Sequence, residues 1–198
     1  MSNSLAIVLY FVIPRAPTFQ LSADTPLTAD NDVKANFTRT PAQMQWQAQL
    51  NVAIDTKANW IPVRTKCPRR PVLRDRADRS RVALQIHISD FELNVYDLDS
   101  YKRVGTGAIH GGRTSFPGRS LTPTLLDLNF DYRAKNDSDP TLINYYQACA
   151  HKYDTVKRPG LSIIVELKMA VRGKIGKTQA ATTVSGLECP IELPANNS

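Results

Sequence analysis

The sequence predicts an all-β domain with one short inserted helix, on the evidence of alternating strands, frequent turn residues and one helical segment. Residues Met44–Asp55 alternate strictly between apolar and polar side chains, which is the period of a strand with one buried face. Thirteen prolines and nine glycines, spread along the 198 residues, indicate many turns. Short strands broken by turns are typical of a sandwich or barrel, and the chain length suits one such domain.

The strands expected after Met44–Asp55 are shorter. Residues 84–88 and 91–95 alternate in opposite phases, and a β-bulge at Ser89 and Asp90 reconciles the two runs. The remaining expectations are one hairpin region and three alternating strands: residues 99–107, 126–132, 161–171 and 181–193. The domain should therefore contain about seven strands.

One segment between these strands has helical spacing. Ser138 and Asp139 offer a helix cap, and Pro140 follows where the first turn of a helix tolerates proline. The apolar residues that follow recur at helical intervals: Leu142, Tyr145, Tyr146 and Cys149. We expect an amphipathic helix over residues 139–152 that covers an open edge of the sheet.

Most of the positive charge lies in one short stretch. The chain has a net charge of +7, while Arg64–Arg81 holds eight basic and two acidic residues. A basic face across the whole fold is therefore not expected, and nucleic acid is not the expected partner. Residues 64–85 are interpreted as a solvated loop, as retained non-coding sequence, or as a patch for an anionic partner formed by Arg69, Arg70, Arg74 and Arg76.

The N-terminal region begins with an unbroken apolar run, Leu5–Ile13. As a helix this run would cross only part of a bilayer, because spanning takes about 20 residues. It also lacks the basic flank and the cleavage site of a signal peptide. Residues 1–15 are interpreted as a partial membrane anchor, with a buried strand as the alternative. A linker over residues 16–40 then leads to a β-domain at residues 41–194.

Three cysteines and three glycosylation triplets bear on the compartment. In an oxidising compartment Cys149 and Cys189 would form a disulfide and Cys67 would be left over. In a reducing compartment Cys149 and Cys189 would be small buried thiols. The triplets that begin at Asn36 and Asn136 lie in polar, turn-like sequence, which is compatible with glycosylation.

No motif predicts catalysis, a cofactor or a metal ion. Residues 173–178 end like a phosphate-binding loop, but a valine stands where the first glycine is required. The three histidines lack the paired spacing of metal ligands. A group of acidic residues is interpreted as a solvated strand edge, with a cation site or the acid–base pair of a hydrolase as alternatives: Asp90, Glu92, Asp97 and Asp99.

Four segments resemble the late embryogenesis abundant group 2 domain, also called the water-stress and hypersensitive-response domain: residues 46–63, 90–107, 129–139 and 167–194. The similarity is strongest to the membrane-anchored fungal branch of that family. It implies an immunoglobulin- or fibronectin-III-like β-sandwich behind one N-terminal membrane helix. It also implies a lumenal, vacuolar or extracellular location and no catalytic residues.

The function expected from this resemblance is that of a non-enzymatic, membrane-associated binding or stress-related module. Its apolar N-terminal segment would lie in the membrane, and its partner would be a protein or a lipid. The alternative is a soluble binding domain that uses the Arg-rich loop on anionic lipid or nucleic acid.

Overall fold

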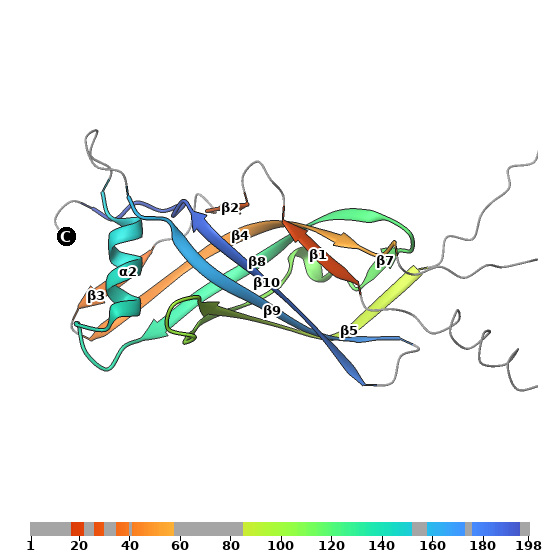
Figure 1. Cartoon of the computed structure of the whole chain (residues 1–198), viewed down its shortest axis with the longest axis horizontal. Helices are drawn as coiled ribbons and strands as arrows, with labels where there is room; N and C mark the ends of the chain where they lie inside the picture. Colours follow the sequence, from red (N-terminus) through yellow and green to blue (C-terminus); the bar gives the residue numbers. More distant parts are fainter. Residues whose placement is uncertain are drawn as a thin grey trace, which may run out of the picture.

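The computed structural model describes residues 17–21, 26–29, 35–39, 41–57, 85–151, 158–172 and 176–194. Strands dominate this part of the chain, and it contains one α-helix. The strands form a single antiparallel sheet that curls until its two ends nearly meet, so that opposite sides of the sheet face each other across the core (Figure 1). The predicted all-β fold with one short helix is therefore confirmed.

The elements follow one another in the order β1 (Thr18–Leu21), β2 (Leu27–Thr28), β3 (Asn36–Arg39), β4 (Ala42–Asp55), β5 (Gln85–Asp97), β6 (Arg103–Ile109), the 3₁₀ turn η1 (His110–Gly112), β7 (Ser115–Pro117), β8 (Leu121–Arg133), α2 (Pro140–Cys149), β9 (Leu161–Val171) and β10 (Lys177–Leu187). The main path through the sheet is β1-β4-β8-β6-β5-β9-β10. The described residues form ten strands, against about seven predicted, and seven of the ten lie on this path. The short strands β2 and β3 pair with β4, and β7 pairs with β5.

The longest strand pair joins β4 to β8 without a register shift, from Gln43 opposite Arg133 to Asp55 opposite Leu121. Its inner face carries the apolar side chains that alternation predicts. Trp46 stacks on Phe130 with ring centroids 4.0 Å apart and an angle of 2° between the planes. Such aromatic pairs contribute about 0.5–1.5 kcal/mol beyond the area that they bury. This pair therefore fixes the centre of the core.

Helix α2 covers one end of the curled sheet (Figure 1). Its inner side buries Leu142, Tyr145 and Ala148. The Tyr145 ring lies 6.1 Å from the Phe130 ring, centroid to centroid, so the helix rests directly on the β4–β8 core. The predicted amphipathic helix is thus present, and its buried side closes this end of the sheet.

The bulge predicted in β5 is also present. The register between β5 and β9 shifts between Ser89 and Glu92, and Asp90 has a φ of 48°. The last strand ends earlier than predicted, at Leu187, because the chain bends through a bulge at Gly186, which has a φ of 70°. Strands β1, β2 and β3 lie in the segment expected to be a linker; two to four residues each are too few to show alternation.

The structure contradicts the predicted membrane partner and membrane location. No helix in the described ranges is long and apolar enough to cross a bilayer. Helix α2 has 10 residues, while a spanning helix needs about 20. A membrane anchor over residues 1–15, with the domain on a lumenal, vacuolar or extracellular side, is therefore not supported. The run Leu5–Ile13 itself lies outside the described residues.

The close approach of β6 to its neighbours β8 and β5 depends on Gly107. A Cβ atom at this position would lie 2.6 Å from the backbone oxygen of Asp127 and 2.9 Å from the Cδ2 atoms of Leu93 and Leu128. We expect Gly107→Ala to lower the free energy of unfolding by about 1–3 kcal/mol, the usual cost of overpacking. Urea unfolding followed by tryptophan fluorescence measures this loss, with the exposed Ser185→Ala as the control. Equal stability of Gly107→Ala and the wild type would contradict the close packing.

Candidate functional site

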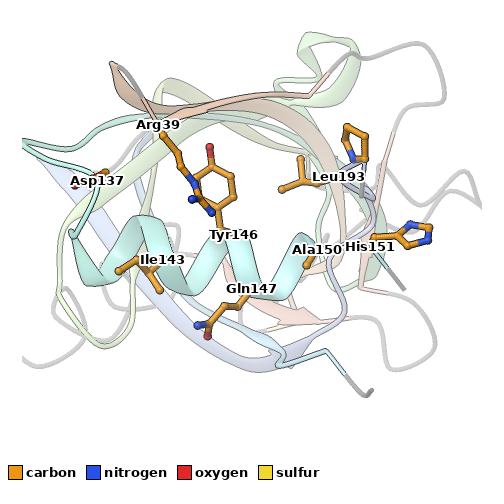
Figure 2. A pocket seen from close by; sticks show the side chains of 9 residues that line it. Arg39, Asp137, Ile143, Tyr146, Gln147, Ala150, His151 and Leu193 are labelled. Atoms are coloured by element: carbon orange, nitrogen blue, oxygen red, sulfur yellow. The ribbon is translucent and has the colours of Figure 1, made fainter. Parts of the chain in front are cut away.

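A half-open groove of about 360 Å³ lies on the outer side of helix α2. We call it the α2 groove. It is bounded by the helix, by the end of β3 and by the segment that follows β10 (Figure 2). Its lining residues are Arg39, Asp137, Ile143, Tyr146, Gln147, Ala150, His151, Leu193 and Pro194. The volume lies at the small end of the range for ligand pockets, about 300–1,000 Å³.

One side of the α2 groove is an aromatic and cationic stack. Tyr146 meets Phe37 edge to face, with ring centroids 5.2 Å apart, and the guanidinium of Arg39 lies 5.7 Å from the centre of the Tyr146 ring. No ion pair of Arg39 with a carboxylate is present within the described part of the chain. Burial raises the pKa of Tyr146, and the nearby Arg39 opposes this shift. The Tyr146 phenol therefore stays neutral.

Apolar side chains supply the rest of the lining. Ile143 is 37% exposed on the outer face of the helix, which is unusual for a large aliphatic side chain in this fold. Leu193 is buried opposite it on the C-terminal segment. The α2 groove therefore combines an apolar floor with two groups of opposite charge in its lining, Arg39 and Asp137. Because Arg39 makes no ion pair with a carboxylate among the described residues, it is the group that can bind a negative charge carried by an apolar ligand.

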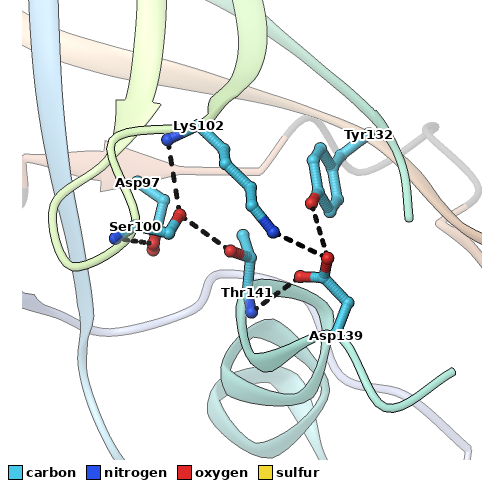
Figure 3. A network of polar contacts seen from close by, with 6 residues as sticks. All are labelled: Asp97, Ser100, Lys102, Tyr132, Asp139 and Thr141. Carbon is cyan, nitrogen blue, oxygen red and sulfur yellow. Dashed lines mark hydrogen bonds and ion pairs between the residues drawn. The ribbon is translucent and has the colours of Figure 1, made fainter. Parts of the chain in front are cut away.

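A network of polar contacts fixes the first turn of helix α2 (Figure 3). The Asp139 side chain accepts a hydrogen bond from the Thr141 backbone N–H at 3.0 Å, as the cap predicted from the sequence requires. Its other oxygen accepts from Lys102 Nζ at 2.7 Å and from the Tyr132 hydroxyl at 3.1 Å. The Thr141 hydroxyl donates to Ser100 Oγ at 2.8 Å. The network thus joins the helix to β8 and to the turn before β6.

The pKa shifts in this network favour the ion pair between Lys102 and Asp139. Burial by itself would raise the pKa of Asp139, but the hydrogen bonds from Lys102 and Tyr132 outweigh it, so the pKa is lowered. The hydrogen bond to Asp139 raises the pKa of Lys102. Burial raises the pKa of Tyr132, which keeps the phenol protonated as a donor. All three groups therefore stabilise the arrangement in which Asp139 is ionised.

The other end of the helix is held by a disulfide and an arginine. Cys149 and Cys189 form a disulfide, with Cα atoms 5.2 Å apart, and it links the last turn of α2 to the segment after β10. Arg158 donates to the backbone oxygens of Ala150, Ile191 and Cys189 at 3.0–3.2 Å. We call this arrangement the C-terminal clasp. It holds the wall of the α2 groove that contains Leu193.

The remaining predicted site residues lie apart from the groove or outside the described ranges. Asn36 and Asn136 are exposed, so both are accessible, and their glycosylation stays a prediction. Cys67 and the proposed anionic-partner residues lie outside the described ranges: Arg69, Arg70, Arg74 and Arg76.

Two of the acidic residues near the β5–β6 turn make hydrogen bonds to residues close to them in sequence. Asp97 is 3% exposed and accepts a hydrogen bond from the Ser100 backbone N–H at 2.9 Å. Glu92 accepts from the Asn94 side chain at 3.0 Å, which lowers the pKa of Glu92. No group of three or more potential metal ligands occurs among the residues that the structure describes.

Arg39 and Arg158 are candidate functional residues that no sequence pattern predicted. Arg39 belongs to a segment read as a linker, and Arg158 lies in the connection between α2 and β9. A lone arginine in such sequence carries no local pattern, and only the fold brings both to the helix. The predicted helix has both Tyr145 and Tyr146 on its apolar face. In the structure Tyr145 is buried, while Tyr146 is half-buried and lines the groove.

Comparison of the chain with protein-family models and with curated proteins finds no match. The resemblance to the late embryogenesis abundant group 2 domain therefore stays a prediction.

The pKa of Asp139 leads to a test of the polar network. Because this pKa is lowered by folding, its ionised form stabilises the fold above the unfolded value of about 3.9, and that contribution is lost as the pH falls through the folded value. We expect Asp139→Asn, which keeps a capping oxygen, to be less stable than the wild type at pH 7, and the difference to disappear as the pH falls below about 4.

Urea unfolding at several pH values measures this difference. Asp139→Ala, which loses the cap as well, should cost about 1 kcal/mol more than Asp139→Asn. A difference between wild type and Asp139→Asn that stays constant from pH 7 to pH 3 would show that the charge of Asp139 contributes nothing.

Proposed function

We propose that this protein is a non-enzymatic binding module that uses the α2 groove to hold a segment of a partner protein. The bound segment places an aliphatic or aromatic side chain against Ile143 and Leu193 and an acidic side chain on Arg39. One observation carries the proposal: Arg39 lies over the ring of the half-buried Tyr146, beside the exposed Ile143. Among the described residues, no carboxylate forms an ion pair with Arg39.

The chemistry of the groove supports a protein partner. Tyrosine and arginine are enriched among residues that dominate the energy of protein interfaces, and both are held in position before binding. Tyr146 is fixed by the Phe37 ring, and Arg39 lies over the Tyr146 ring. Rigid walls reduce the entropy lost on binding, and the C-terminal clasp and the Asp139 network supply that rigidity at the two ends of α2.

The charge at the groove supports an acidic group on the partner. A carboxylate can form two parallel hydrogen bonds with the planar guanidinium of Arg39, and the partly apolar surroundings strengthen such a contact. His151, at the other end of the groove, is paired with Glu192. Recognition of an acidic and an apolar side chain on one segment follows from this arrangement. A stress-related role, as the resemblance implies, is compatible with such a module.

Peptide display on the intact, oxidised protein tests the proposal. We expect enrichment of peptides that carry an acidic residue next to an aliphatic or aromatic one. Arg39→Gln and Ile143→Asp should each weaken the selected peptides by about tenfold or more, equal to about 1.4 kcal/mol. Arg39→Glu should shift the selection toward basic peptides, because it reverses the charge at the groove.

The matched control is Arg103→Gln, which removes an exposed arginine of β6 that is not among the lining residues. It should leave binding unchanged. A selection without this consensus would overturn the proposal, as would peptides that bind equally well to the wild type, Arg39→Glu and Ile143→Asp.

A further inference from the structure

A second hollow, of about 510 Å³, lies on the outer face of the sheet above β8. It shares no lining residue with the α2 groove and is independent of the function proposed for that groove. We call it the amide hollow. Its lining residues come from β4, β6, η1 and β8: Gln47, Ala48, Gln49, Thr106, Gly107, Ala108, His110, Asp127, Leu128 and Asn129.

The register of the three strands explains the shape of the hollow. Gln47 lies opposite Asn129, and Asn129 lies opposite Thr106 on the other side. In the next row Gln49 lies opposite Asp127, and Asp127 lies opposite Ala108. Long amide side chains therefore stand on β4, while short side chains stand on β6. This difference in height leaves room over β8.

One polar group in the hollow is fixed in place. The Asp127 carboxylate accepts a hydrogen bond from Gln49 Nε2 at 3.1 Å, and His110 Nδ1 lies 3.0 Å from both of its oxygens. An ionised carboxylate has about four lone-pair sites, and these two neighbours use only part of them. Asp127 therefore has lone pairs left for a ligand in a position set by two neighbours from different strands.

Two other polar groups are uncommitted. Gln47 and Asn129 are exposed, and neither side chain makes a hydrogen bond with another residue in the described ranges. Each carboxamide offers two donors and an acceptor oxygen. Side chains opposite each other on paired strands have Cβ atoms about 4.5–5.5 Å apart, so both amides can reach neighbouring groups of one ligand.

The lining of the hollow selects against anionic ligands. No lysine or arginine lines the hollow, so a phosphate or carboxylate would meet no fixed cation. The only carboxylate, Asp127, already contacts Gln49 and His110. The remaining groups are amides and the Thr106 hydroxyl, which both donate and accept. Hydroxyl groups also do both, and many of them on one small molecule match such a lining.

We propose that the amide hollow binds a neutral, polyhydroxylated ligand of the saccharide class. Gln47 and Asn129 bind neighbouring hydroxyls, Asp127 accepts from a third, and the small Ala108 leaves space for the ring. The lining contains no tyrosine, tryptophan or phenylalanine ring on which a sugar could stack, so affinity is weak, with a Kd of about 1 mM.

Titration of the ¹⁵N-labelled intact protein with maltose, cellobiose and trehalose tests the proposal. At about 10 mM, tenfold above the expected Kd, at least one disaccharide should produce saturable shifts in the side-chain amide signals of Gln47 and Asn129. Gln47→Ala and Asn129→Ala should each weaken binding by about fivefold to tenfold. Gln43→Ala, which removes an amide from the same face of β4 outside the hollow, should leave the Kd unchanged.

A phosphorylated sugar separates this proposal from an anion site. Glucose 6-phosphate should bind no better than glucose, because no lysine or arginine lines the hollow. The proposal is overturned if none of the three disaccharides shifts these amide signals, if the shifts map outside the hollow, or if Gln47→Ala and Asn129→Ala bind as well as Gln43→Ala. Tighter binding of glucose 6-phosphate than of glucose would overturn it equally.

Discussion

The pairing of β4 with β8 is the contact on which the rest of the structure depends. Its inner face stacks Trp46 on Phe130, and Tyr145 of helix α2 packs against the same ring. Its outer face places Gln47 opposite Asn129 and so forms one row of the amide hollow. Because side chains alternate strictly along a strand, a shift of one residue would exchange these two faces. Core and surface are therefore set by the same register.

Helix α2 turns this core into a candidate binding surface. A short helix that rests on a sheet exposes one face, and this face gains two rigid borders because each end of the helix is attached to a different part of the chain. Asp139 ties its start to Lys102 and Tyr132, while the disulfide of Cys149 ties its end to the segment after β10. The α2 groove thus depends on contacts between elements that are distant in sequence.

Local patterns predicted much of the fold and little of the two candidate sites. The alternation of Met44–Asp55, the bulge at Asp90 and the cap at Asp139 each depend on a few adjacent residues, and the structure has all three. The pairing of β4 with β8, and the approach of Arg39 to Tyr146, depend on the closure of the sheet. The predicted membrane anchor is not supported, because no helix in the described part of the chain could cross a bilayer. By pattern alone, an apolar run of nine residues fits a strand as well as part of a helix.

Native-state hydrogen exchange tests the central place of the β4–β8 pair most directly. We expect the central amides of β4 and β8 to exchange most slowly, with a free energy equal to that of global unfolding. The amides of α2 should exchange sooner, through local opening of the end that they cover. Exchange of the β4 and β8 amides before those of α2 would contradict the view that the helix and both candidate sites are built on this strand pair.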